Sequence, residues 1–532
     1  MSDSMSDAMS DAMSGATPTA APGAASGITP ATARETTSVL ISGAGPTGLT
    51  LACLLARQGV AVRVVELAPE PHSGSRGKAL NARSLEVLAD LGLAEALLAS
   101  GRTNLPFRRY FEGAFVAESD PAAETPATPA APYPSSLFLP QDRVEALLRG
   151  RLEDLGGSVE FGTGLAGFAQ DGERVTARLA DGREIEARYL VGCDGGRSTV
   201  RKRLAIPFTG DSEPEPAMVV GDLEIGGLEP TAWHQWFGPQ GALLLCPFGD
   251  EDGRWQVQAT PETGPDGTAL APSLEGFRRI VAEYTGDESI EVRGAGWLSS
   301  WRVNVRVAEQ YRVGRVLLAG DAAHVHPTAG GLGMNTGIQD AWNLGWKLGH
   351  VLTGLARPTL LDTYEEERQP IAAWTLRTST AGMAAVAEGA RTPGVGLEAV
   401  RVDDLTGLSL GYRWSPLAKD GLGTSLQAGD RAPDAPCTDA EGRPIRLLET
   451  FVGDRFTLLA FGHQPSADLP GHVRTVTVDA DDPAGLRDTD GHARRAYGIE
   501  GAALVLVRPD NHVALTARQG EEQAVLDYLG GL

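Results

Sequence analysis

Residues 38–66, SVLISGAGPTGLTLACLLARQGVAVRVVE, constrain the fold more than any other stretch of the chain. Val39, Leu40 and Ile41 predict a short buried strand, the turn G-x-G-x-x-G follows, and Leu49 to Gln58 predict a helix. A second apolar strand, Val60 to Val65, ends on Glu66, 18 positions after the last glycine of the turn. This succession of strand, turn, helix and acidic residue is typical of a dinucleotide site.

The chemistry of such a site follows from the residue types. Gly43, Gly45 and Gly48 would let the backbone approach a pyrophosphate, which the positive end of the helix dipole would face. Glu66 would accept hydrogen bonds from a ribose diol, which favours the adenosine half of FAD or NAD over that of NADP. A plain β–α–β crossover, whose glycines only tighten the turn, is the alternative interpretation.

Composition excludes several classes of function. The formal charge of −23 argues against nucleic acid and anionic membranes as partners. The four cysteines, Cys53, Cys193, Cys246 and Cys437, lack C-x-x-C or histidine spacing, so we expect no metal and reduced thiols in a cytoplasm. Residues 1–36 contain few bulky apolar residues and no signal-peptide pattern, which predicts a disordered tail. No apolar run is long enough to span a membrane.

Three later segments add polar groups at predicted junctions. A cationic pair, Arg76 and Lys78, precedes a predicted helix, and Gln141 stands at the start of another, QDRVEALLRGRLEDLG. A β-meander ends in YLVGCDGGRSTVRKRL, where Asp194 and Gly195 follow a strand. A strand from Val316 to Ala319 meets Gly320 and Asp321, and a long helix is expected from about Thr336.

The rest of the chain predicts two further units. Residues 216–300 indicate an antiparallel sheet that binds substrate, and its aromatic residues Trp236, Phe237, Phe248 and Trp297 could line a pocket or simply form core. We therefore expect an α/β architecture with a Rossmann-like FAD-binding domain, an antiparallel-sheet substrate domain and a C-terminal thioredoxin-like domain. The expected boundaries are a tail at 1–36, FAD-binding segments at 37–215 and 301–400, the sheet at 216–300, a linker at 401–426 and the last domain at 427–532, with 100–140 able to contribute to the substrate side.

Together, G-x-G-x-x-G with Glu66, Asp194-Gly195, and Gly320-Asp321 followed by HPTAGGLGMNTGIQDAWNLGWKL resemble the single-component flavoprotein monooxygenases of the para-hydroxybenzoate hydroxylase fold. The phenol and aromatic polyketide hydroxylases are the most similar type. The resemblance covers roughly residues 37–400. The tail from about 427 is similar to the thioredoxin-like domain of many members, here without C-x-x-C, so we expect a structural or oligomeric role rather than a redox one.

The resemblance implies non-covalent FAD and NADPH or NADH as co-substrate. It implies that the turn and Glu66 hold the ADP part, that Arg76 and Gln141 approach the diphosphate and ribose, and that Asp321 binds the ribityl chain. It also links Asp194-Gly195 to both nucleotides, and gives the isoalloxazine the backbone N–H groups of the loop through Gly330 to Gly333. The full set of implied cofactor residues is Gly43, Gly45, Pro46, Thr47, Gly48, Glu66, Arg76, Gln141, Asp194, Gly195, Gly320, Asp321, Pro327, Gly330, Gly331, Leu332, Gly333, Met334 and Asn335.

One position departs from the family pattern, because Thr328 stands where members usually place a proline near the flavin and the proline is Pro327 instead. The implied reaction captures O₂ as a flavin C4a-hydroperoxide and delivers OH to an electron-rich ring of a small aromatic substrate, in a monomer or homodimer. Baeyer–Villiger insertion into a polycyclic ketone uses the same flavin site, so it stays open. A reductase that does not use O₂, or a flavin-binding protein without turnover, also stays open, whereas the halogenase motif W-x-W-x-I-P is absent from the sequence.

Overall fold

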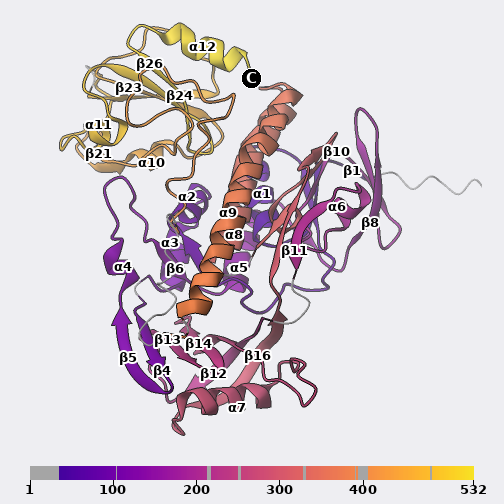
Figure 1. Ribbon diagram of the computed structural model, residues 1–532. Coiled ribbons are helices and arrows are strands. Elements are labelled where there is room, and N and C mark those ends of the chain that lie inside the picture. Colours follow the sequence, from indigo (N-terminus) through magenta and orange to yellow (C-terminus); the bar gives the residue numbers. More distant parts are fainter. Residues whose placement is uncertain are drawn as a thin grey trace, which may run out of the picture.

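The computed structural model describes residues 35–103, 105–212, 217–249, 253–326, 331–389, 391–392, 405–479 and 482–532. Its central sheet places five parallel strands in the order β19, β10, β1, β2 and β7 (Figure 1). These strands are β1 (Glu35–Ser42), β2 (Val62–Val65), β7 (Val159–Glu160), β10 (Glu184–Gly192) and β19 (Val316–Leu318). Antiparallel strands β8 (Leu165–Gln170), β9 (Val175–Leu179) and β18 (Arg312–Val313) complete the sheet.

The predicted disordered tail ends earlier than expected. Glu35 and Thr36 already belong to β1, where they pair with Ile185 and Glu186 of β10, and Glu35 forms an ion pair with Arg63. The prediction was wrong for these two residues because their order comes from pairing with distant strands, and residues 1–34 lie outside the described part.

Helices cover this sheet and connect it to the rest of the molecule. Helix α1 (Pro46–Arg57) packs against α8 (Leu332–Thr353). Both helices begin earlier than predicted, α1 at Pro46 instead of Leu49 and α8 at Leu332 instead of Thr336. Helix α9 (Asp362–Gly389) runs from beside the C-terminal domain towards the second sheet (Figure 1). The remaining helices of this part are α2 (Ala82–Asp90), α3 (Ala94–Ser100), α4 (Pro121–Glu124), α5 (Gln141–Asp154) and α6 (Thr199–Arg203), with 3-10 turns η1 (Gly320–Ala322) and η3 (Pro358–Leu361).

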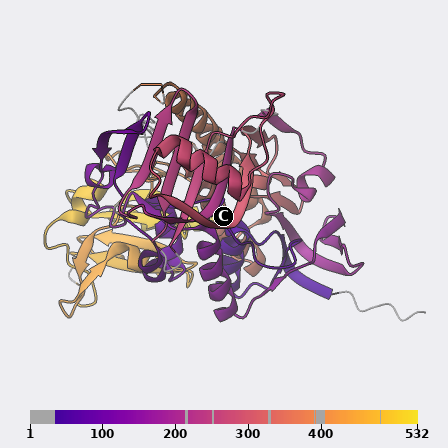
Figure 2. The same ribbon diagram turned by 90° about the horizontal axis from the view of Figure 1, so that it is seen from below.

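The second large sheet has seven strands in the order β16, β12, β15, β14, β13, β4 and β5. Strands β4 (Phe107–Phe111) and β5 (Ala114–Ser119) come from a distant segment, and β4 pairs in parallel with β13. Helix α7 (Leu274–Thr285) lies across one face, as the view from below shows (Figure 2). The other strands are β12 (Met218–Gly226), β13 (Trp233–Gly238), β14 (Gly241–Pro247), β15 (Arg254–Ala259) and β16 (Glu291–Trp301).

Two small sheets link these layers: β3 (Ala79–Asn81) pairs with β6 (Ser136–Phe138), and β17 (Asn304–Ala308) pairs with β11 (Phe208–Ser212) and β20 (His324–Val325). The C-terminal domain contains the mixed sheet β24 (Val473–Val478), β23 (Phe456–Phe461), β25 (Ala503–Val507) and β26 (Val513–Arg518), as predicted. The hairpin of β21 (Pro436–Thr438) and β22 (Pro444–Arg446) and the helices α10 (Leu447–Thr450), α11 (His492–Tyr497) and α12 (Glu522–Gly530) surround it. Within the described residues, no helix has the length and apolar character to cross a bilayer.

Candidate functional site

The sequence motifs meet at one edge of the parallel sheet. Gly43 follows β1, Glu66 follows β2, Asp194 lies two residues beyond the end of β10, and Gly320 follows β19 after one residue. Because these strands are parallel neighbours, their carboxyl ends share an edge, which is where open α/β sheets bind ligands. The described motifs are therefore brought together as the sequence predicted.

Each glycine of the turn is required, or tolerated, for a different structural reason. Gly43 has φ +107°, and a Cβ there would collide with the backbone of Cys193. A Cβ on Gly48 would collide with the carbonyl oxygen of Gly43, so this residue allows helix α1 to pack tightly on the turn. No heavy atom lies within 4 Å of the position where Gly45 would carry its Cβ. The start of α1 is thus open on one side, and its first N–H groups have no side-chain cap.

Glu66 stabilises the turn and retains capacity for a ligand. Its two carboxylate oxygens accept hydrogen bonds from the N–H groups of Ala44 at 2.8 Å and Ala68 at 2.9 Å. Each carboxylate has about four lone-pair sites. Glu66 therefore fits a ribose diol as a further partner.

Asp194 has a different local role from the one that the motif suggests. Its carboxylate accepts hydrogen bonds from Ser198 Oγ at 2.5 Å and from the N–H groups of Thr199 at 2.7 Å and Val200 at 3.2 Å, so it caps α6. Gly195, next to it, has φ +75°. The carboxylate shapes the bend after β10, and any contact with a nucleotide stays a prediction.

Gly320 and Asp321 lie against the first turn of α1. Gly320 has φ +61°, and a Cβ on it would lie 2.5 Å from Thr47 Oγ1; a Cβ on Gly337 of α8 would collide with the same oxygen. The Asp321 side chain is exposed to solvent. Desolvation by the neighbouring protein raises the pKa of the Asp321 carboxyl above its usual value, although His324 and Arg76 oppose the shift. A carboxylate at this position can accept hydrogen bonds from ligand hydroxyls.

The residues that open α8 complete this edge. Gly331 is the N-cap with φ +64°, Leu332 is buried, and Gly333 lies close to His326. Buried Asn335 donates to the carbonyl oxygens of Ala79 at 3.0 Å and Gly331 at 2.7 Å. The N-terminus of α8 is therefore fixed to strand β3, while Pro327 and Gly330 lie outside the described residues.

A loop of residues 72–78 connects this edge to the seven-stranded sheet. Asp222 of β12 accepts hydrogen bonds from the Ser75 N–H at 2.8 Å and from the Ser75 hydroxyl, and Gln256 of β15 donates to the Ser75 carbonyl. A Cβ on Gly74 would lie 2.5 Å from Trp297 Cγ. The exposed Arg76 is thus held between the two sheets.

Gln141 and Met334 lie beside Gly77 of the same loop. A Cβ on Gly77 would lie 3.0 Å from Gln141 Oε1 and 3.6 Å from Met334 Sδ. Gln141 begins α5 and donates to Glu145 at 2.8 Å. Gln141 and Met334 therefore meet at Gly77, the residue next to Arg76, although the three segments are far apart in the chain.

The seven-stranded sheet has one apolar face and one mixed face. On the first, Leu243, Leu245 and Val257 pack beneath Phe277 and Ile280 of α7. Side chains alternate along a strand, so the opposite face carries Gln235 and Phe237 of β13, Cys246 of β14, Gln256 of β15 and Asp222 of β12. We call it the inner face, because Asp222 and Gln256 hold the loop that leads to the parallel sheet.

Of the two alternatives that the sequence left open for Trp236, pocket or core, the structure supports core. Trp236 is 3% exposed, belongs to the apolar cluster under α7 and stacks on Tyr110 at a ring-centroid distance of 4.5 Å. Its position in β13 directs it away from the inner face, and the sequence could not fix this alternation because every residue of β13 is buried. Phe237, Phe248 and Trp297 as pocket residues stay predictions.

Comparisons with known proteins agree with this geometry. The family model described as "FAD binding domain" matches residues 36–379, and the one described as "Aromatic-ring hydroxylase, C-terminal" matches residues 425–529. The chain belongs to the FAD-dependent aromatic-ring hydroxylases. It is thus an FAD-dependent monooxygenase, and its described motif residues fit the cofactor that the family binds.

Three relatives illustrate the extent of the match. A flavin-dependent monooxygenase of Mycobacteroides abscessus is 39% identical over 506 residues, covering 92% of this chain and 99% of the relative. A 6-methylpretetramide 4-monooxygenase of Streptomyces rimosus is 39% identical over 516 residues, covering 90% of each chain. The crystal structure of the flavin-dependent monooxygenase PieE with FAD and substrate has a TM-score of 0.80 at 26% identity, covering 93% of this chain and 99% of PieE.

This hydroxylase also contains a buried ionic network next to Gly320, which the sequence analysis did not predict. Asp340 of α8 accepts hydrogen bonds from the Gly320 N–H at 3.0 Å and Arg368 Nε at 2.7 Å, and its oxygen lies 2.6 Å from His324 Nε2. Burial opposes its charge, but His324 and Arg368 outweigh burial and hold the pKa of Asp340 at about 2. The carboxylate therefore fixes the backbone beside Asp321. The available signal was a carboxylate within a segment whose apolar stripe predicted a helix.

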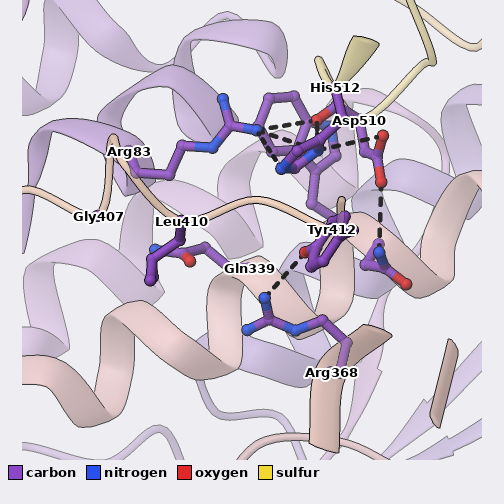
Figure 3. A pocket seen from close by; sticks show the side chains of 10 residues that line it. Arg83, Gln339, Arg368, Gly407, Leu410, Tyr412, Asp510 and His512 are labelled. Atoms are coloured by element: carbon purple, nitrogen blue, oxygen red, sulfur yellow. Dashed lines mark hydrogen bonds and ion pairs between the residues drawn. The ribbon is translucent and has the colours of Figure 1, made fainter. Parts of the chain in front are cut away.

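The network continues into the hydroxylase's C-terminal domain. Arg368 donates to the Tyr412 hydroxyl at 2.9 Å, and the Tyr412 ring lies 4.4 Å from that of His512. Figure 3 shows these residues around a small pocket, with Arg83 reaching towards Asp510 and His512. Residues 405–412 pass through this junction, so part of the predicted linker is built into a domain interface. Gln339, Trp342 and Asn343 of α8 line this pocket, whereas Gly337 and Gly345 lie on the face of α8 that packs on α1.

Proposed function

We propose that this hydroxylase uses NAD(P)H and O₂ to hydroxylate a flat, polycyclic phenol of polyketide type, with FAD held non-covalently. The observation that carries the proposal is the shared edge at which the open N-terminus of α1 and the exposed Asp321 carboxylate lie, next to a loop anchored on the inner face. The similarity to a 6-methylpretetramide 4-monooxygenase supports the substrate class.

We assign the cofactor contacts by residue. Gly43, Gly45, Gly48 and Glu66 would hold the ADP part, because they combine close backbone approach, unpaired helix N–H groups and a diol acceptor. When bound, FAD supplies the transfer of hydride from NAD(P)H and the activation of O₂.

A second group of residues would orient the flavin. Arg76 and Gln141 would approach the diphosphate and ribose, and Asp321 the ribityl hydroxyls. Gly331, Leu332 and Gly333 at the start of α8 would present N–H groups to the ring. The inner face would exclude water and position the substrate ring.

The experiment that tests this function is incubation of purified holoenzyme with NADPH, ¹⁸O₂ and a panel of polycyclic phenols, followed by mass spectrometry. We expect a product with one labelled oxygen and an intact carbon skeleton. A lactone would indicate Baeyer–Villiger insertion instead, and NADPH oxidation without label in any product would indicate a reductase.

A matched pair of variants tests the cofactor site. Asp321→Ala should purify with much less FAD, because hydrogen bonds to a charged acceptor are worth about 1.5–3 kcal/mol each. Asp468→Ala removes an exposed carboxylate of the C-terminal domain and should retain FAD. Equal FAD content in both variants would contradict the assignment of Asp321.

A further inference from the structure

Lys78 is a buried amine that the cofactor assignment does not use. It stands immediately before β3, and its Nζ lies 4.0 Å from the centroid of the Trp233 ring. This nitrogen is inaccessible to solvent and has no hydrogen-bond partner among the described residues. An amine in this situation is unusual, because a buried ammonium is costly unless it is paired.

The charges around Lys78 do not compensate it. Of the described groups that act on the charge of Lys78, the Cys246 thiol is the one that favours it, and no described carboxylate takes part. Burial lowers the pKa of Lys78 to about 8 and raises that of Cys246 to about 11, and Arg102 also acts on this thiol. This corner therefore has a deficit of negative charge.

The position of Lys78 joins the two halves of the site. On one side, its neighbour Ala79 is hydrogen-bonded to Asn335 at the start of α8. On the other side, Trp233 and Cys246 form a small cluster with Phe138 on the inner face of the seven-stranded sheet. The amine thus lies between the start of α8 and the surface against which a substrate would lie.

We propose that Lys78 selects substrates with an acidic ring hydroxyl by pairing its ammonium with the phenolate or enolate oxygen. This inference rests on the proposed function. The step moves one proton and no electrons: the hydroxyl O–H breaks, and its proton goes to the neutral amine, which becomes the ammonium, or to solvent when the amine is already protonated. The resulting oxyanion satisfies the buried charge and makes the ring more electron-rich, which an electrophilic oxygen donor requires.

Lys78→Met tests this inference, because methionine keeps an unbranched apolar chain against Trp233 and removes the charge. Lys202→Met is the matched control, since Lys202 is exposed on α6. The probes are 1-naphthol and 1,8-dihydroxyanthraquinone, each compared with its methyl ether by titration of the oxidised holoenzyme. We expect the wild type and Lys202→Met to bind the hydroxyl probes at least tenfold more tightly than the ethers, and Lys78→Met to lose this preference.

Two further measurements distinguish selection from general packing. Bound dihydroxyanthraquinone should show the long-wavelength absorption of its anion in the wild type and in Lys78→Arg, but not in Lys78→Met. FAD content should be equal in all variants. Loss of FAD from Lys78→Met would assign the amine to the cofactor and overturn the proposal.

The remaining outcomes are also decisive. The inference fails if the wild type binds hydroxyl and ether probes equally, if it binds neither, or if Lys78→Met keeps the preference. Labelled hydroxylation together with any of these results leaves the proposed function standing. A Lys78-dependent preference without oxygen incorporation contradicts the proposed function alone.

Discussion

Replacing Glu367 by glutamine should weaken the attachment of the C-terminal domain more than any surface substitution. The Glu367 carboxylate is completely buried, and it accepts hydrogen bonds from Arg508 at 2.7 and 2.9 Å and from Lys347 at 2.7 Å. It also accepts from Asn343 and Ser415, each at 2.6 Å. One carboxylate thus compensates two buried cations, and these hold its pKa well below the usual value although burial opposes the shift.

The magnitude follows from what the substitution leaves behind. Removing one partner of a buried ion pair costs about 3–5 kcal/mol, because the other charge stays buried without compensation. Asp510 still contacts Arg508 at 2.9 Å, so we expect the lower end of this range, about 3 kcal/mol. The amide of glutamine also directs N–H donors towards a site crowded with donors.

Urea denaturation followed by far-UV circular dichroism and by flavin fluorescence measures the effect, and limited proteolysis reports release of the C-terminal domain. Glu441→Gln is the control, because Glu441 is 64% exposed in its ion pair with Arg443, and such pairs contribute about 1 kcal/mol or less. A loss of stability in Glu367→Gln no larger than that of Glu441→Gln would refute the reasoning.

Three other perturbations have defined outcomes. Arg76→Ala should slow the anaerobic reduction of FAD by NADPH while FAD stays bound; a wild-type rate, or loss of FAD, would contradict a role in reduction. Burial lowers the pKa of His234 and His512 to about 4, whereas unfolded histidine titrates near about 6.5. The unfolded chain therefore binds more protons between these values, so the urea midpoint should fall as pH is lowered from 6.5 to 4, and a flat profile would contradict this. Cys437→Ser should keep full turnover, because the buried thiol has a pKa raised to about 12 by burial and does not form a reactive thiolate; a severe loss would restore a redox role.

The features that sequence could predict are local ones. The G-x-G-x-x-G turn, Glu66 and Gly320-Asp321 each combine a strand end with residues whose conformational or charge requirement is visible within a few positions. Their meeting at one edge follows from parallel pairing, which alternation of strands and helices already predicted.

The features that sequence could not predict depend on residues far apart in the chain. The hydrogen bonds between Ser75 and Asp222 and between Glu367 and Arg508 join residues more than a hundred positions apart, so no local sequence pattern predicts them. Charged residues in buried positions also contradict the hydrophobic pattern on which core prediction relies. In RWQVQA, Gln256 and Gln258 alternate with apolar residues within one strand. This alternation was the sign in the sequence that the inner face is mixed.

The hydrogen bonds that anchor the loop of residues 72–78 limit how this part of the enzyme can move. Ser75 is hydrogen-bonded to the second sheet and Ala79 to α8. Between them, the carbonyl oxygens of Gly77 and Lys78 accept hydrogen bonds from the N–H groups of Gln141 at 3.1 Å and Leu139 at 3.0 Å. The backbone on both sides of Arg76 is therefore held, and it can neither swing outward as a lid does nor rotate about Gly77 without breaking these hydrogen bonds. Motion at this place should therefore be limited to the exposed side chain of Arg76, which can change what the cofactor meets while the backbone beside it stays in place.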